Sequence, residues 1–167
     1  MKIAYGADWL MLKETLSNVN LQLTALLKEA EDFHGHFGPF LVIGVRAALI
    51  GLTKLEIEKG DPELSATAML KNSTPFSCIL DGVQVVTGCT VGNKRLRLED
   101  SSNIAIRFEN KNGKQVEIEV NSTTLDKLIE QLSAQNLESE EVRRIGYTIA
   151  SMDERELFRV KSETGSS

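Results

Sequence analysis

Residues 104–120, IAIRFENKNGKQVEIEV, decide the fold class of this chain. Apolar and polar side chains alternate on both sides of Asn112-Gly113, a dipeptide typical of β-hairpin turns. Intervening positions such as Arg107 and Glu117 are charged, so one face of the sheet is expected to meet solvent, as is common in antiparallel sheets. The stretch therefore predicts an antiparallel sheet built around a hairpin.

Helical patterns precede and follow this hairpin. Before it, apolar residues recur every three or four positions from Trp9 to Phe33, and a helix is expected from Pro39 to about Ile57. A short strand at 65–72 and a helix over 74–87, ending at Gly88, follow. After the hairpin come helices near 123–132 and 142–152, the first with a capping box at Thr123 and Asp126. A short edge strand is expected at 156–160.

These patterns predict an α+β fold in which N-terminal helices pack on the antiparallel sheet and C-terminal helices close the chain. One domain is expected over residues 21–162, with a helical extension at 1–20 and a disordered tail at 163–167. Gly44 and Gly51 lie inside a predicted helix, where glycine is unfavourable by ~1 kcal/mol. Their presence indicates that another backbone approaches this helix closely.

The composition excludes several classes of function. A net charge of −5 argues against a nucleic-acid partner, which needs a basic face. The most apolar run, Phe40 to Leu52, is shorter than the ~20 residues of a membrane span and contains Arg46, so it predicts a buried helix. No secretory signal is expected. A cytoplasmic protein follows, with thiols that are reduced.

The only two histidines stand one residue apart, as His34-Gly35-His36, shortly before Pro39. Neutral imidazole is the commonest side-chain ligand of transition metals. Gly35 lets the backbone turn, so both rings can converge on one ion. The alternative is that one histidine caps the following helix while the other lies on the surface, and the spacing leaves both interpretations open.

Both cysteines, Cys78 and Cys89, flank one short segment. Their separation matches no zinc-knuckle spacing, and a free cysteine is most often a small buried hydrophobe. If Cys78 joined His34 and His36, three ligands would leave a fourth position for water, substrate or a partner, as in catalytic or exchangeable zinc sites.

Two ordered motifs and the end of the chain resemble one known family. The first motif is Phe33-His34-Gly35-His36 with Pro39 and Gly44-Val45-Arg46, and the second is Cys78, Asp81-Gly82-Val83-Gln84 and Thr87-Gly88-Cys89-Thr90. Together with the closing stretch DERELFRV at 153–160, they resemble the FmdE family, proteins similar to the FmdE component of the molybdenum or tungsten formylmethanofuran dehydrogenase. The resemblance implies an α+β core, a homodimer with intertwined helices, and a metal, usually zinc-like, at the His-x-His and cysteine positions.

One position departs from the family pattern. The family usually has His-Gly-His-x-Cys-Pro-Gly, whereas Gly38 stands here where that cysteine would be. If the missing thiol is a ligand or nucleophile in relatives, this chain either binds metal with fewer ligands or has lost an activity.

The combined prediction is a cytoplasmic, dimeric protein that binds a divalent transition metal, zinc above others, through His34, His36 and Cys78, with Cys89 as a weaker fourth ligand. The resemblance adds an accessory role beside a molybdenum or tungsten formate-type enzyme in the one-carbon metabolism of methanogens or other anaerobes.

Residues around the predicted ligands have a supporting role in this interpretation. Asp81, Gln84 and Thr87 are expected to line the pocket or orient the ligands. Two rivals remain open: a metal-independent thiol enzyme with Cys89 or Cys78 as nucleophile and His36 as base, and a structural dimer with a vestigial site.

Overall fold

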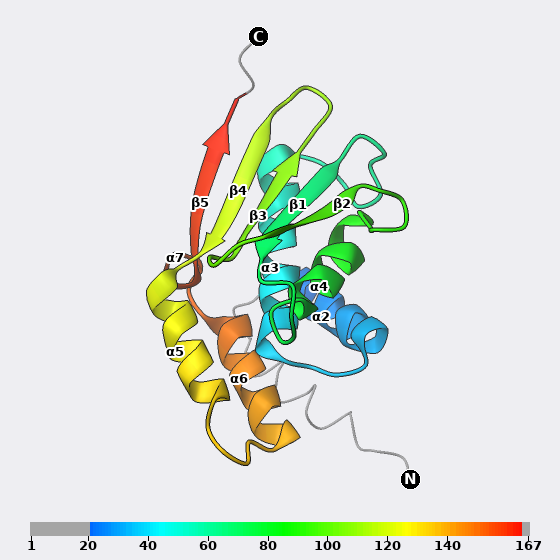
Figure 1. Cartoon of the computed structure of the whole chain (residues 1–167). Helices are drawn as coiled ribbons and strands as arrows, with labels where there is room; N and C mark the ends of the chain where they lie inside the picture. The colour runs from blue at the N-terminus through cyan, green and yellow to red at the C-terminus, as the bar shows by residue number, and fades with distance from the viewer. Residues whose placement is uncertain (1–20, 165–167) are drawn as a thin grey trace.

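The computed structural model describes residues 21–164, and within them the chain forms six helices and one five-stranded sheet (Figure 1). The elements, in chain order, are α2 (Leu21–His34), α3 (Pro39–Leu55), β1 (Ser65–Leu70), α4 (Cys78–Thr87), β2 (Leu96–Asp100), β3 (Ala105–Glu109), β4 (Gln115–Val120), α5 (Ser122–Leu132), α6 (Ser139–Ser151), α7 (Glu154–Leu157) and β5 (Phe158–Glu163). The α+β class predicted from the sequence is confirmed. The predicted extension at 1–20 and the last residues of the predicted tail lie outside the described residues.

The sheet has the strand order β2-β1-β3-β4-β5, and its hairpin is the predicted one. Strands β3 and β4 pair antiparallel from Ala105↔Glu119 to Glu109↔Gln115. The turn is closed by Asn110, whose Oδ1 accepts hydrogen bonds from the backbone N–H groups of Asn112 and Lys114. One pair differs from the prediction: β1 and β2 are parallel, because α4 forms a crossover between them. The sheet is therefore mixed, although mostly antiparallel.

Helix α3 packs on one face of the sheet, behind the strands in Figure 1. That face carries the buried apolar side chains of the strands, among them Phe108, Ile106 and Ile118. Gly51 is a glycine because a Cβ there would lie 2.4 Å from the ring of Phe108. The close neighbour at Gly51 is thus a side chain of the sheet, whereas a backbone was expected.

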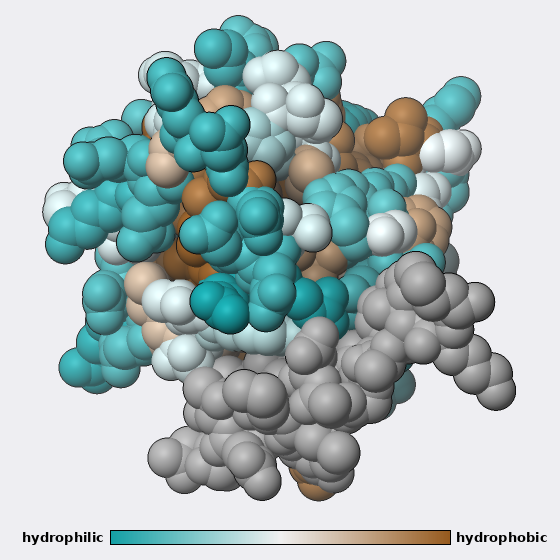
Figure 2. Space-filling view, turned by 90° about the horizontal axis from the view of Figure 1, so that it is seen from below, coloured by the Kyte–Doolittle hydropathy of each residue, from teal (hydrophilic) through white to brown (hydrophobic). Residues whose placement is uncertain are grey.

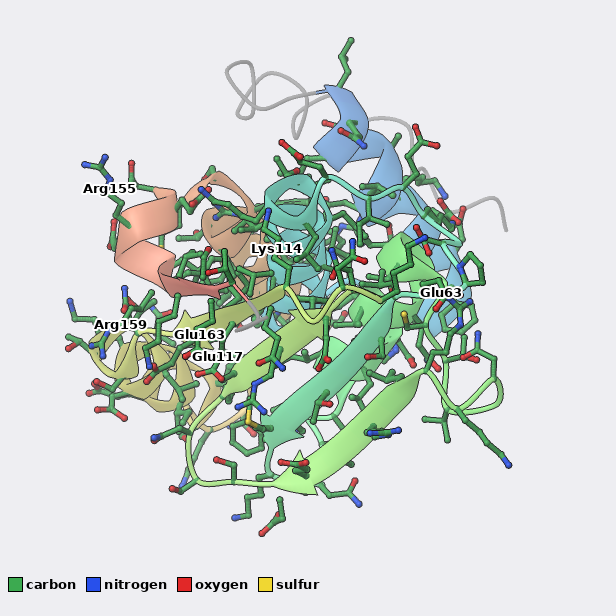
Figure 3. The ribbon with its side chains drawn as sticks, turned by 90° about the horizontal axis from the view of Figure 1, so that it is seen from above. Glu63, Lys114, Glu117, Arg155, Arg159 and Glu163 are labelled. Atoms are coloured by element: carbon green, nitrogen blue, oxygen red, sulfur yellow. The ribbon has the colours of Figure 1, made fainter. Side chains whose placement is uncertain are left out.

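The opposite face of the sheet is charged, as the hairpin sequence predicted. Arg107 donates to Glu117 across β3 and β4 at 2.9 Å, and Lys161 on β5 donates to Glu119 at 3.2 Å. Figure 3 shows the molecule from above, with Glu117 and Glu163 labelled on β4 and β5. No helix covers this face among the described elements.

Helix α4 crosses α3 at two glycines. A Cβ on Gly44 would lie 2.2 Å from the carbonyl oxygen of Ile79, and a Cβ on Gly82 would lie 2.6 Å from the carbonyl oxygen of Leu41. Neither position can hold a side chain unless the helices separate. The close backbone approach predicted from Gly44 is confirmed, and it fixes α4 beside the N-terminal half of α3.

Three details of the helices correct the sequence analysis. The buried stripe of α2 includes Leu27, whereas Phe33, the last residue of the predicted apolar pattern, is 61% exposed. Helix α5 follows Asn121 with no side-chain cap, so the predicted box at Thr123 is wrong; a capping box occurs instead at Glu138 on α6. Strand β5 is the predicted edge strand, extended to Glu163.

In the described part of the chain, no helix combines the length and apolarity that a bilayer span requires.

Candidate metal centre

The two histidines are brought together by a sharp turn between α2 and α3. His34 is the last residue of α2, and Gly35 adopts φ +96°, a left-handed conformation in which glycine is favoured. The ring of His36 consequently folds back against that of His34, with centroids 4.4 Å apart and planes tilted by 37°. The convergence expected from the Gly35 spacer is present.

Cys78 joins this pair from α4. It is the first residue of that helix, which the Gly44–Gly82 crossing holds against α3. One potential ligand atom from each of His34, His36 and Cys78 lies within 4.8 Å of the other two. Two ligands of one tetrahedral zinc ion are about 3.3–3.8 Å apart, so modest side-chain rotation would bring all three onto one ion.

A hydrogen-bonded chain of side chains on α4 supports His34. The Nδ1 atom of His34 lies 2.6 Å from Oδ2 of Asp81, which is one turn beyond Cys78 on α4. Gln84, a further three residues on, donates from Nε2 to Oδ1 of Asp81 at 3.0 Å. Because an ionised carboxylate only accepts, Nδ1 carries the proton, and in the neutral imidazole Nε2 is then the nitrogen with the free lone pair. That Nε2 is buried and has no hydrogen-bond partner.

The surroundings of His36 and Cys78 favour the neutral form of each before any metal binds. Burial lowers the pKa of His36, and the neighbouring His34 lowers it further, against an opposing effect of Glu31. Burial also raises the pKa of the Cys78 thiol, and the carboxylate of Asp81 acts in the same direction. The imidazole of His36 is therefore available as a ligand, while the thiol of Cys78 holds its proton.

Cys89 and Thr87 lie away from this cluster. They stand at the other end of α4, whose ten residues span about 15 Å, and Gly88 ends that helix with φ +74°. The Cys89 thiol is fully buried and donates to the carbonyl of Leu64 at 3.4 Å. The Thr87 hydroxyl donates to the carbonyl of Val83 and accepts from the N–H of Cys89. Both residues secure the end of α4, and we leave Cys89 out of the candidate ligand set.

A cavity of about 280 Å³ opens beside the cluster. His36 and Cys78 form part of its wall, and the rest is apolar, including Pro39, Phe40, Pro75, Leu132, Leu137 and Val142. Figure 2 shows the molecule from below, the side on which α3 and α6 begin; apolar surface is visible there in a hollow among hydrophilic side chains.

One ion pair behind the histidines was missed by the sequence analysis. Glu31, buried one turn before His34, pairs with Arg143 of α6, whose guanidinium also lies 5.1 Å from the ring centroid of Phe37. Phe37 in turn lies against Gly146, where a Cβ would be 2.8 Å from its ring. These contacts fix the His36-Phe37 segment against α6. The sequence did offer one signal for this ion pair, because Glu31 interrupts the apolar stripe of α2.

Comparison with known proteins places this geometry in a family. A family model described as "FmdE, Molybdenum formylmethanofuran dehydrogenase operon" matches residues 33–159, which include all three clustered residues. The chain belongs to the FmdE family. Its sequence is 33% identical over 150 residues to a protein of Archaeoglobus fulgidus described as a probable S-adenosyl-L-methionine-binding protein. That match covers 89% of this chain but 40% of the relative, so the chain spans about two-fifths of the relative's length.

A solved structure has the same fold. It is the crystal structure of an FmdE-like protein of the tungsten formylmethanofuran dehydrogenase type from Syntrophus aciditrophicus, with a TM-score of 0.54 and 19% identity. The alignment covers 86% of this chain and 73% of the other. At this identity, the likeness between the two proteins concerns the fold alone.

Proposed function

We propose that this member of the FmdE family binds one divalent transition metal through His34 Nε2, an imidazole nitrogen of His36 and the sulfur of Cys78. The observation that carries the proposal is the state of His34: Asp81 engages Nδ1, and the remaining nitrogen is buried without a partner. A carboxylate behind a ligating histidine is the usual arrangement in zinc proteins, where it fixes the tautomer and raises the basicity of the ligand. A buried orphan acceptor is costly unless something binds it.

The chemistry of the donors favours zinc. Two imidazoles and one thiolate form a borderline-soft set that suits zinc better than magnesium or calcium, which prefer oxygen. Three protein ligands leave a fourth position, and this is the layout of catalytic or exchangeable sites. The apolar cavity adjoins His36 and Cys78, so an exogenous molecule could reach that position.

Elemental analysis of protein purified without an affinity tag tests this proposal. We expect about one zinc equivalent per chain, lost in His34→Ala and Cys78→Ser. Cys89→Ser is the matched control, because its thiol lies at the far end of α4, and it should keep its metal. Metal absent from the wild type, or retained by both site variants, would contradict the proposal.

Two features weaken the rival of a metal-independent thiol enzyme. A nucleophilic cysteine needs a depressed pKa, whereas burial raises the pKa of both Cys78 and Cys89. Cys89 is moreover fully buried and engaged with Leu64. Neither thiol has the environment of an activated nucleophile.

We further propose that the protein is cytoplasmic and acts as an accessory to a molybdenum or tungsten enzyme of the formate type in anaerobic one-carbon metabolism, such as methanogenesis. Family membership supports the association with such an enzyme system, and the two unpaired cysteines suit a reducing compartment. Co-purification of the untagged protein with a molybdenum- or tungsten-containing fraction from an anaerobic host tests the role. Separation from every such fraction at physiological salt would contradict it.

We also propose a homodimer formed through α2. Leu21 and Phe33 are 72% and 61% exposed on this helix, so both apolar side chains are available for a contact with a second subunit. Sedimentation equilibrium should give twice the chain mass of 18.5 kDa, and Phe33→Ser should shift the protein towards monomer. A monomeric wild type at micromolar concentration would rule the dimer out.

A second candidate function is binding of S-adenosyl-L-methionine, favoured by the 33% identity to the Archaeoglobus relative. The cavity gives it less support, since no carboxylate, the usual partner of a ribose hydroxyl, lines it in the described part of the chain. Calorimetric titration of metal-loaded protein with this compound tests the second candidate, and the absence of any binding heat would rule it out.

A further inference from the structure

The residues that line the cavity beside the cluster favour a small ligand with an apolar body. At about 280 Å³ it lies just below the usual range for small-molecule sites, about 300–1,000 Å³, so its occupant is small. Apart from His36 and Cys78, its lining contains no ionisable side chain within the described residues. An occupant therefore needs an apolar body, and its polar atom must find a partner at the His36 and Cys78 side of the cavity.

Charge at the site restricts the polar atom of the occupant. A divalent ion held by two neutral imidazoles and one thiolate retains one positive charge, so it favours an anionic fourth ligand. A carboxylate would leave its second oxygen facing apolar wall without a donor, which is costly. A thiolate presents one soft sulfur to the ion and has no second atom to satisfy.

Gly38 leaves space in the cavity wall beside His36 and Cys78. It lines the cavity with His36 and Cys78, and it is buried in extended backbone with φ −151° and ψ 167°. A Cβ there would meet nothing nearer than Val142 Cγ1 at 3.5 Å and His36 Cδ2 at 4.0 Å. The backbone does not require glycine, and the absent side chain leaves room beside the proposed metal position.

We propose that this cavity binds a small thiol with an apolar body, which coordinates the metal as a thiolate at its open position. The inference rests on the proposed metal site. On binding, the S–H bond of the ligand would break and its proton would pass to solvent, while a bond from its sulfur to the metal would form and a water at the open position would leave. No electrons are transferred.

Titration of the cobalt-substituted protein tests the proposal, because each thiolate bound to Co²⁺ adds charge-transfer absorption in the near ultraviolet. The two probes are phenylmethanethiol and 1-thioglycerol, which share a thiol head and differ in the polarity of the body. We expect phenylmethanethiol to bind at least about tenfold more tightly, since its ring loses contact with water in the apolar cavity.

Three variants locate the binding. Leu137→Asn, in the cavity wall, should remove most of the preference for phenylmethanethiol, whereas Ile129→Asn, an exposed residue of α5 outside the cavity, should keep it. Gly38→Cys should retain cobalt with added charge-transfer intensity and lose the response to either thiol, because its own sulfur takes the open position.

The possible failures are distinguishable. Stoichiometric cobalt binding with equal affinity for both thiols, or a phenylmethanethiol preference that survives Leu137→Asn, overturns the ligand proposal and leaves the metal site standing. Absence of cobalt binding in the wild type overturns both.

Discussion

At the scale of single residues, the structure assigns different tasks to side chains that share one helix. On α4, Cys78 and Asp81 lie one turn apart and both face the histidines, Cys78 as a candidate ligand and Asp81 as the partner of His34. Gln84 completes the turn by donating to Asp81. The sequence predicted supporting roles for Asp81 and Gln84, whereas the third such residue, Thr87, belongs to the buried end of the helix.

The carboxylate of Asp81 gives a direct prediction. Asp81→Asn removes the acceptor charge that fixes the tautomer of His34, so we expect zinc affinity to fall by about 10–100-fold. Competition with a chromophoric chelator measures the change. Asp126→Asn, an exposed carboxylate on α5, is the control and should leave the affinity unaltered. Equal affinities for Asp81→Asn and wild type would remove Asp81 from the site.

The raised pKa of Cys78 predicts a slow thiol in metal-free protein. In a Cys89→Ser background at pH 8, iodoacetamide should alkylate Cys78 more slowly than it alkylates free cysteine, because burial and Asp81 keep the sulfur protonated. Zinc should slow the reaction further. Alkylation faster than that of free cysteine would favour the thiol-enzyme rival.

His36 gives the site a defined pH dependence. Because burial and His34 lower its pKa in the folded state, the unfolded chain binds the proton more tightly. The contribution of His36 to stability is therefore present above the unfolded pKa of about 6.5 and is lost as the pH falls through the folded value. In metal-free protein, the free energy of unfolding of wild type relative to His36→Gln should decline from pH 7.5 to pH 5. A difference that rises towards acid pH has the wrong sign for this account.

At the scale of elements, the crossing of α3 and α4 positions the cluster. Gly44 and Gly82 let the two backbones touch, and Cys78 begins the helix that this contact holds in place. The two histidines come from the preceding α2–α3 turn. The site is therefore assembled from one turn and one helix N-terminus that meet only because both glycines lack a side chain.

Adding a methyl group at this crossing should disturb both stability and metal binding. Gly44→Ala would bring a Cβ against the carbonyl of Ile79, and we expect a loss of about 1–3 kcal/mol in the free energy of unfolding, as for other overpacked contacts. Urea denaturation measures the loss. Gly92→Ala is the control, because the nearest atom to its Cβ is Thr90 Oγ1 at 3.7 Å. A Gly44→Ala protein as stable as wild type would show that the crossing adapts freely.

At the scale of the whole molecule, the fold was more predictable than the geometry of the site. Alternating residues and Asn112-Gly113 predicted the hairpin, and Pro39 and Gly88 marked helix boundaries, because each signal is local and depends on backbone conformation. The parallel pairing of β1 with β2 depends on the path of α4, which no local pattern records. The exposure of Phe33 likewise depends on which neighbours α2 meets.

The prediction of the metal ligands from the sequence had the same limit. His34, His36 and Cys78 were predicted together from residue chemistry and family resemblance, and the structure brings them into one cluster. Cys89 has the same chemistry, but α4 separates it from the others, so composition alone could not distinguish the two cysteines. The apolar cavity could not be predicted, since Leu132, Leu137 and Val142 come from C-terminal segments far from the motif in sequence.

Anomalous diffraction at the zinc edge, from crystals of untagged protein grown without added metal, tests the central claim most directly. The account predicts one peak per chain, at bonding distance from Nε2 of His34, a ring nitrogen of His36 and Sγ of Cys78. A peak coordinated by other residues, or protein that binds no zinc even after reconstitution, would contradict it.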